Sequence, residues 1–145
     1  MKTASIAWAL ALAIGAGAAW GAGVGSPAKN YRLYCSGCHR ADAAGNPGVG
    51  VPDMRNRIGD FVKVPEGRAF LVQVPGTSQS PLDDAETAAL INWVLATYSA
   101  RELPPGFAPY TAQEVAQLRA HPLVDVPGQR ARVLQQLHEM GLNPG

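Results

Sequence analysis

Hydrophobic positions recur at helical spacing in several stretches of this chain, and no stretch alternates as a half-buried strand would. The clearest pattern covers residues 85–100. Asp83 precedes it and Glu86 follows three residues later, which is the spacing of a capping box. The pattern therefore predicts a helix over 85–100. The apolar face of that helix carries Leu90, Trp93, Val94 and Thr97.

Shorter patterns predict helices on the amino-terminal side of this one. Apolar and aromatic residues at 30–35 indicate a short helix that ends at a pair of cysteines. Residues 67–74 predict two helical turns, closed by Pro75 and Gly76. Between these stretches, repeated glycine and proline predict an irregular segment over 42–66.

Two more helices are expected beyond the break at residues 103–109, where prolines and a glycine cluster. Thr111 and Glu114 repeat the capping-box spacing and open a helix that Pro122 must stop. A last helix is predicted over 130–140. Its apolar stripe is Val133, Leu137 and Met140, with Gly141 as the C-terminal stop.

The chain is therefore expected to be all-α, with long ordered loops. The length of 145 residues allows one domain and little more. The pattern divides it into a compact core over residues 26–100 and a helical C-terminal extension over 101–145.

The amino terminus has the pattern of a secretory signal peptide, predicted over residues 1–22. Lys2 is followed by an uncharged apolar run that ends in small residues. Cleavage is expected between Ala18 and Gly23. The run falls short of the ~20 apolar residues of a spanning helix, so no stable membrane span is expected in the mature chain. These signals predict export, to the periplasm.

Charge and cysteine content exclude two broad classes of protein. The formal net charge is +1 and no two lysines or arginines are adjacent, so the basic stripe of a nucleic-acid-binding protein is missing. Two cysteines are too few for a disulfide-stapled secreted scaffold. They are expected to act as a pair.

The pair lies in the sequence Cys35-Ser-Gly-Cys38-His39. A thioredoxin-type dithiol would need a surrounding βαβ pattern, and a zinc site would need further ligands at fixed spacing. The histidine directly after the second cysteine instead makes C-x-x-C-H, the attachment motif of c-type haem. The motif predicts one haem c, bound covalently through Cys35 and Cys38, with His39 as the proximal iron ligand.

Residues 28–100 resemble a class I c-type cytochrome, a mono-haem family. Tyr31 lies four residues before the first cysteine, where the family has an aromatic residue. The segment Gly50-Val-Pro-Asp-Met54 resembles the family's Gly-Pro-Asn-Leu segment, and Trp93 matches the aromatic of its last helix. The resemblance implies that Pro52 accepts a hydrogen bond from the His39 ring through its carbonyl.

The chain departs from this family at the sixth iron ligand, which is normally a methionine in the loop before the last helix. Residues 74–81 contain no methionine. Three alternatives are open. Met54 ligates the iron, although its place in the family is that of a packing leucine; a histidine of the extension ligates it, with His121 favoured over His138; or the position is open.

The resemblance implies a periplasmic electron-transport protein that carries single electrons between redox protein partners and is not an enzyme. Two alternatives are a weakly ligated or five-coordinate haem protein that binds a small ligand, as a gas sensor or peroxidase does, and a haem subunit of a larger dehydrogenase. A local excess of cations is expected to dock an acidic partner, to neutralise haem propionates, or to form a solvated face. These cations are Arg55, Arg57, Lys63 and Arg68.

Overall fold

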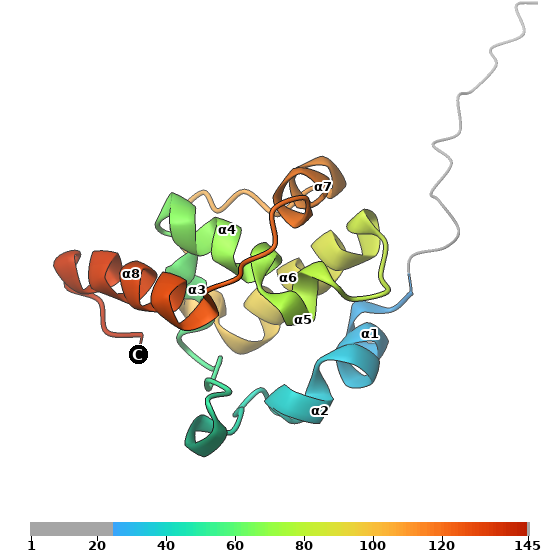
Figure 1. Cartoon of the computed structure of the whole chain (residues 1–145), viewed down its shortest axis with the longest axis horizontal. Coiled ribbons are helices and arrows are strands. Elements are labelled where there is room, and N and C mark those ends of the chain that lie inside the picture. The colour runs from blue at the N-terminus through green and yellow to red at the C-terminus, as the bar shows by residue number, and fades with distance from the viewer. Residues whose placement is uncertain (1–24, 145) are drawn as a thin grey trace, which may run out of the picture.

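A computed structural model describes residues 25–144 as helices joined by ordered loops (Figure 1). The helices are α1 (Pro27–Tyr34), α2 (Ser36–His39), η1 (Pro47–Val49), α3 (Ile58–Phe61), α4 (Pro65–Gln73), α5 (Pro75–Ser78), α6 (Asp84–Tyr98), η2 (Ala100–Glu102), α7 (Ala112–Arg119) and α8 (Val126–Glu139).

The all-α prediction is confirmed. Over residues 25–144 the only β-type pairing is an isolated bridge between Asn46 and Val51. Within the same range, no helix has the length and apolar character needed to cross a membrane. The predicted signal peptide and its cleavage zone lie outside the described residues.

Helix α6 is the central element and separates two hydrophobic clusters. The predicted capping box is present: Asp83 accepts a hydrogen bond from the Glu86 backbone, and Glu86 accepts one from the Asp83 backbone. Leu90 and Val94 pack into one cluster, and Ile91 and Leu95 pack into the other. Thr97 is exposed, which corrects the predicted face. Because one cluster packs on each side of α6, the helix is buried on two sides.

The first cluster, called here the Tyr31 cluster, joins α1 to α6. Its buried members are Tyr31, Ala43, Leu82, Leu90 and Val94. The second, called the Leu95 cluster, joins α3, α4 and α6 to the C-terminal extension. Its buried members are Phe61, Val64, Phe70, Leu71, Val72, Ala88, Ile91, Leu95, Tyr110, Val115, Val133 and Leu137.

The C-terminal extension is packed into the Leu95 cluster. Val115 of α7 and Val133 and Leu137 of α8 are fully buried there, and each such side chain contributes about 1.5–3 kcal/mol. Asn92 of α6 also bonds the Tyr110 backbone in both directions, at 2.9 and 2.8 Å. The division at residue 101 stays a prediction, but the two parts share one core. Met140 is exposed, so the prediction that it shares the buried stripe of Val133 and Leu137 is wrong.

Several helix boundaries differ from those that local signals predict. The segment 42–66 contains η1 and α3, and Pro75 begins α5, whereas the sequence predicts that it closes a helix. Proline is tolerated at the first position of a helix because that N–H has no intrahelical partner. Asp125 caps α8 by accepting from the Gly128 N–H at 2.9 Å, so this helix begins four residues before the predicted Arg130.

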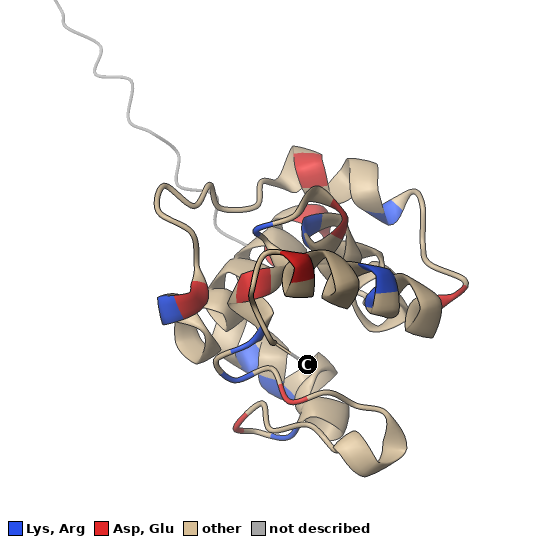
Figure 2. Ribbon diagram, turned by 90° about the vertical axis from the view of Figure 1, so that its left-hand side faces the viewer, with Lys and Arg blue, Asp and Glu red and all other residues tan. Residues whose placement is uncertain are grey.

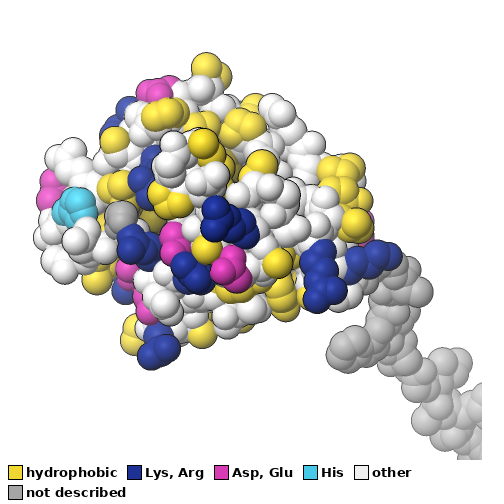
Figure 3. Space-filling view, turned by 90° about the horizontal axis from the view of Figure 1, so that it is seen from below, with side chains coloured by type: hydrophobic (Ala, Val, Ile, Leu, Met, Phe, Trp, Pro, Cys, Tyr) yellow, Lys and Arg dark blue, Asp and Glu magenta, His cyan; other side chains and the backbone are white. Residues whose placement is uncertain are grey.

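Positively and negatively charged residues are interspersed along the ribbon (Figure 2), and their side chains lie among one another on the face drawn in Figure 3. Several of the cations in the expected local excess have acidic partners within the chain. Arg55 pairs with Asp53, Lys63 with Asp60, and Arg68 with Glu114. These pairs offset part of the positive charge, and the docking of an acidic partner at this surface stays a prediction. Glu114 is drawn to Arg68, at 2.6 Å, instead of closing the capping box predicted at Thr111.

Candidate cofactor site

The cysteine motif forms its own helical turn, α2, directly after α1. The His39 N–H donates to the Cys35 carbonyl at 2.9 Å, and Cys35 N–H donates to the Tyr31 carbonyl at 2.9 Å. Both cysteines are free thiols. Burial raises the pKa of the Cys35 thiol, and the neighbouring Cys38 raises it further. One turn of helix therefore brings Cys35, Cys38 and His39 to the lining of the same pocket.

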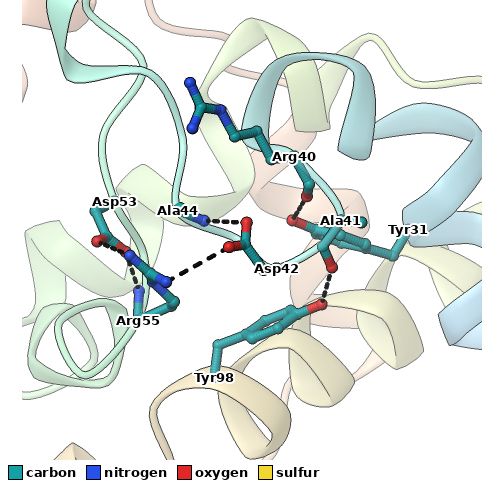
Figure 4. Close-up of polar contacts among 8 residues, drawn as sticks. All are labelled: Tyr31, Arg40, Ala41, Asp42, Ala44, Asp53, Arg55 and Tyr98. Atoms are coloured by element: carbon teal, nitrogen blue, oxygen red, sulfur yellow. Dashed lines mark hydrogen bonds and ion pairs between the residues drawn. The ribbon is translucent and has the colours of Figure 1, made fainter.

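The loop after His39 is held down by two tyrosines from different helices (Figure 4). Tyr31 of α1 donates its hydroxyl proton to the Arg40 carbonyl at 2.8 Å, and Tyr98 of α6 donates to the Ala41 carbonyl at 3.0 Å. Their rings are 5.5 Å apart, and the Tyr31 ring is 5.6 Å from Trp93. Trp93 of α6 therefore contacts α1 through its ring.

A glycine then lets the chain segment at residues 51–54 approach this loop closely. Gly45 has φ +61°, and a Cβ atom placed on it would overlap the Pro52 carbonyl oxygen. Its N–H donates to the His39 carbonyl at 3.0 Å, and the Met54 N–H donates to the Ala43 carbonyl at 3.0 Å. Gly45 therefore positions Pro52 beside His39.

The surroundings of His39 favour a neutral imidazole. Burial lowers its ring pKa, and the smaller effect of the Pro52 carbonyl opposes this. The Nδ1 atom is buried and makes no hydrogen bond of normal length and angle in the structure, although the Pro52 carbonyl is near enough to affect the ring pKa. A neutral ring with a backbone carbonyl beside it is the state in which histidine binds a metal.

The pocket has a volume of about 420 Å³, within the range of about 300–1,000 Å³ typical of cofactor sites. It lies where the Tyr31 and Leu95 clusters meet, so its lining is largely apolar. Its apolar lining includes Phe61, Phe70, Leu71, Leu90, Ile91 and Val94.

Two sets of residues with different origins complete the lining. The first, called here the His39 wall, consists of Cys35, Cys38, His39 and residues 50–54. The second, called the α5–α8 wall, consists of residues 74–77 and Ser80 together with Val126 and Arg130 of α8. Val74 and Val126 pack against the Leu95 cluster, whereas Cys35 and Met54 pack against the Tyr31 cluster.

Two guanidinium groups, Arg57 and Arg130, lie at the pocket. Burial lowers the pKa of Arg130, and the charge of Arg57 lowers it further. Arg57 also donates to the Pro144 carbonyl at 3.5 Å. Bringing two like charges to one apolar pocket is costly, and an anionic group bound between them would offset that cost.

The structure separates the candidates for the sixth iron ligand. Met54 lines the pocket, next to Pro52 on the His39 wall. His121 is exposed and is not part of the lining, and His138 is exposed with its Nε2 atom 3.2 Å from the Asn143 side chain. The structure therefore brings Cys35, Cys38, His39, Pro52 and Met54 together but leaves His121 outside; their roles as ligands stay predictions.

Sequence reasoning misses three residues that shape this site. From the sequence, Gly45 is expected only to interrupt regular secondary structure. Arg119 and Arg130 lie in the C-terminal extension, where no motif predicts a function. The position of Arg130 in the first turns of α8 could have been predicted from Asp125-Val-Pro127, because a capping aspartate followed by a proline marks the start of a helix. Nothing local to Arg119 signals its hydrogen bonds to the carbonyls of Ser78, Ser80 and Leu82, which lie about 40 residues away in the chain.

No protein-family model matches the chain. Among characterised proteins, it is 29% identical over 135 aligned residues to cytochrome c-552 of Thermus thermophilus, which covers 79% of this chain and 98% of the relative. A second cytochrome c-552 of Thermus thermophilus is 28% identical, covering 79% of this chain and 87% of the relative. Residues 1–100 are only about two thirds of the chain, so the similarity reaches into the extension, beyond the range of the family resemblance. The chain is a distant homologue of a c-type cytochrome, with the all-helical fold of a c-type haem protein.

Proposed function

We propose that this chain is an exported mono-haem c-type cytochrome that carries single electrons between redox proteins. The observation that carries the proposal is the placement of Cys35, Cys38 and His39 on one wall of an apolar pocket. The two relatives named as cytochromes support it.

The residues present fit a haem. Two free thiols one helical turn apart are spaced to add across the two vinyl groups of one porphyrin, and a neutral His39 is suited to iron. The apolar lining suits the flat macrocycle, and Arg57 and Arg130 would bind its two propionates. The bound haem supplies reversible one-electron chemistry at its iron. The chain binds it, excludes water and offsets its charge.

Electron transfer to a partner requires a haem edge near the surface, and the position of the motif meets this requirement. Cys38 is exposed, so the edge attached to it would lie at the surface. Large apolar side chains are exposed on the neighbouring elements, with Tyr34 at 45% and Leu33 at 60% on α1 and Val49 at 72% on η1. Apolar groups of this kind suit a short-lived contact with another redox protein.

Export is proposed from the sequence of residues 1–22 and from the chemistry of the motif. Two free thiols one turn apart are the substrate of haem attachment, which for c-type haem takes place outside the cytoplasm. Periplasmic localisation would be tested by fractionating cells that produce the full chain. Retention of the holoprotein in the cytoplasm would contradict this part of the proposal.

The attachment is tested by producing the full chain with haem-attachment machinery and measuring its mass. We expect one covalent haem per chain, and none in the double variant Cys35→Ala, Cys38→Ala. Ser36→Ala is the matched control, because Ser36 lies between the cysteines and, over residues 25–144, its hydroxyl bonds the Arg32 carbonyl alone. A reversible one-electron titration of the holoprotein tests the carrier role. Haem attachment in the double variant, or no reversible redox couple, would overturn the proposal.

A further inference from the structure

We propose that the iron side facing away from His39 is a binding site for a small neutral ligand, kept open because Arg119 of the extension holds the α5–α8 wall in place. This inference rests on the proposed haem and goes beyond the carrier function.

Met54 belongs to the same wall as His39. Its backbone N–H donates to the Ala43 carbonyl, in the loop that follows His39, and its side chain packs in the Tyr31 cluster with Cys35. The two axial positions of a haem iron lie on opposite faces of the ring. A ligand opposite His39 must therefore come from the α5–α8 wall, and Met54 does not.

The α5–α8 wall offers no imidazole, thiolate or thioether. Within residues 25–144, the other histidines and the remaining methionine lie elsewhere: His121 and His138 are exposed, and Met140 is 54% exposed. The polar groups of this wall are the hydroxyls of Thr77 and Ser80 and the guanidinium of Arg130. A hydroxyl is a poor ligand for ferrous iron, and a guanidinium is not a ligand.

Ser80 has hydrogen-bonding capacity to spare. Its Oγ atom is buried and has no hydrogen-bond partner, and the same is true of its neighbour Ser78. A buried hydroxyl without a partner destabilises the fold, and a ligand in the pocket that accepts a hydrogen bond from it would offset part of that cost. This is a second observation, independent of the missing iron ligand, that points to a guest on this side.

Arg119 explains why this wall stays in place without a bond to iron. Its guanidinium donates to the carbonyls of Ser78 at 3.1 Å, Ser80 at 2.9 Å and Leu82 at 2.8 Å, and to the Asp84 carboxylate at 2.9 Å. The side chain is only 18% exposed. Bonds from a charged donor are stronger than neutral ones, so one residue of α7 fixes the segment 78–84.

The lining selects the class of ligand. Phe70, Leu71 and Val74 make this part of the pocket apolar, and an apolar site disfavours ions. A neutral diatomic molecule that binds ferrous haem and accepts one hydrogen bond fits both the apolar surface and the spare hydroxyl. Carbon monoxide is the probe for this class.

The test mixes the reduced holoprotein with carbon monoxide and follows the haem spectrum. We expect rapid and complete binding by the unaltered protein. In Ser80→Ala we expect a shift of the bound C–O stretching frequency, because the hydroxyl that polarises the ligand is gone. Arg119→Gln is expected to change the association rate several-fold, because the segment 78–84 is released. Arg132→Gln is the matched control. Arg132 is exposed on α8, and among the described residues its side chain bonds Gln129 alone, so this variant should bind carbon monoxide at the rate of the unaltered protein.

Two results would overturn this inference and leave the carrier function standing. One is a reduced holoprotein that carries covalent haem but does not bind carbon monoxide. The other is a protein that binds carbon monoxide only after Met54→Leu, which would make Met54 the sixth ligand. Failure of the chain to attach haem at all would instead overturn the proposed function.

Discussion

The two walls of the pocket are built in different ways. The His39 wall comes from residues 35–54, and short-range backbone bonds hold it together. The α5–α8 wall joins segments about 50 residues apart, and packing in the Leu95 cluster and the bonds of Arg119 hold it. The first wall carries all the groups suited to attaching and ligating a haem, and the second carries apolar surface and hydroxyls. The residues suited to binding a haem thus lie in a segment that local backbone bonds hold in place. The position of the α5–α8 wall depends instead on contacts between distant parts of the chain.

The largest effect on stability is expected in the Leu95 cluster, which supports the α5–α8 wall. Leu137→Ala removes a fully buried side chain of α8 and should lower the free energy of unfolding by about 2–5 kcal/mol. Chemical denaturation of the holoprotein measures it. Met140→Ala, next to the same helix but 54% exposed, should change it by less than ~0.5 kcal/mol. Equal effects of the two would mean that α8 does not pack as described.

Gly45→Ala should destabilise the His39 wall, because it forces a change in the backbone. The new Cβ would meet the Pro52 carbonyl oxygen, and the residue would keep an unfavourable positive φ. We expect a loss of about 2–4 kcal/mol in unfolding free energy, with a changed haem spectrum because Pro52 moves from His39. Gly50→Ala separates the two causes. Gly50 has φ +84° and nothing within 4 Å of the position that a Cβ would take. Gly50→Ala should therefore lower the unfolding free energy only by the cost of the positive φ, about 1–2 kcal/mol.

Tyr31→Phe removes one hydrogen bond that holds the loop after His39 and keeps the ring. The expected loss is about 1 kcal/mol, since the Arg40 carbonyl loses its donor at 2.8 Å. Tyr98→Phe is the comparison, because its bond to the Ala41 carbonyl is exposed and should matter less. A larger loss for Tyr98→Phe would show that the inner tyrosine does not hold this loop.

The smallest effect concerns an exposed ion pair at the edge of the His39 wall. Hydrogen bonds from Arg55 lower the pKa of Asp53 in the folded protein. The Asp53 contribution to stability is therefore present above its unfolded pKa and is lost as the pH falls through its folded pKa. Arg55→Ala should raise the Asp53 pKa toward its ordinary value, which NMR titration of the side-chain carboxyl would measure. An unchanged pKa would show that the pair is not formed in solution.

The His39 wall is largely predictable from the sequence, because its determinants are local. A five-residue motif predicts Cys35, Cys38 and His39, which the structure brings to one pocket, and the position of Pro52 near His39 is what the family resemblance implies. The capping residues Asp83 and Glu86 likewise predict the start of α6 correctly. Such signals act within a few residues, so a linear reading captures them.

The α5–α8 wall could not be predicted, because its partners lie far apart in the chain. Periodicity shows that Val133 and Leu137 are buried but not which elements bury them. The exposure of Met140 and Thr97 shows the same limit: helical spacing marks a stripe, and tertiary packing decides how much of the stripe is covered. The four bonds of Arg119 have no counterpart in any short motif.

The contrast between the two walls is tested most directly by resonance Raman spectroscopy of the reduced holoprotein. If the chain supplies one axial ligand, His39, and nothing from the α5–α8 wall, the coordination markers will show five-coordinate, high-spin iron. Six-coordinate, low-spin iron in the unaltered protein would mean that a side chain does reach the second position, and would contradict the account.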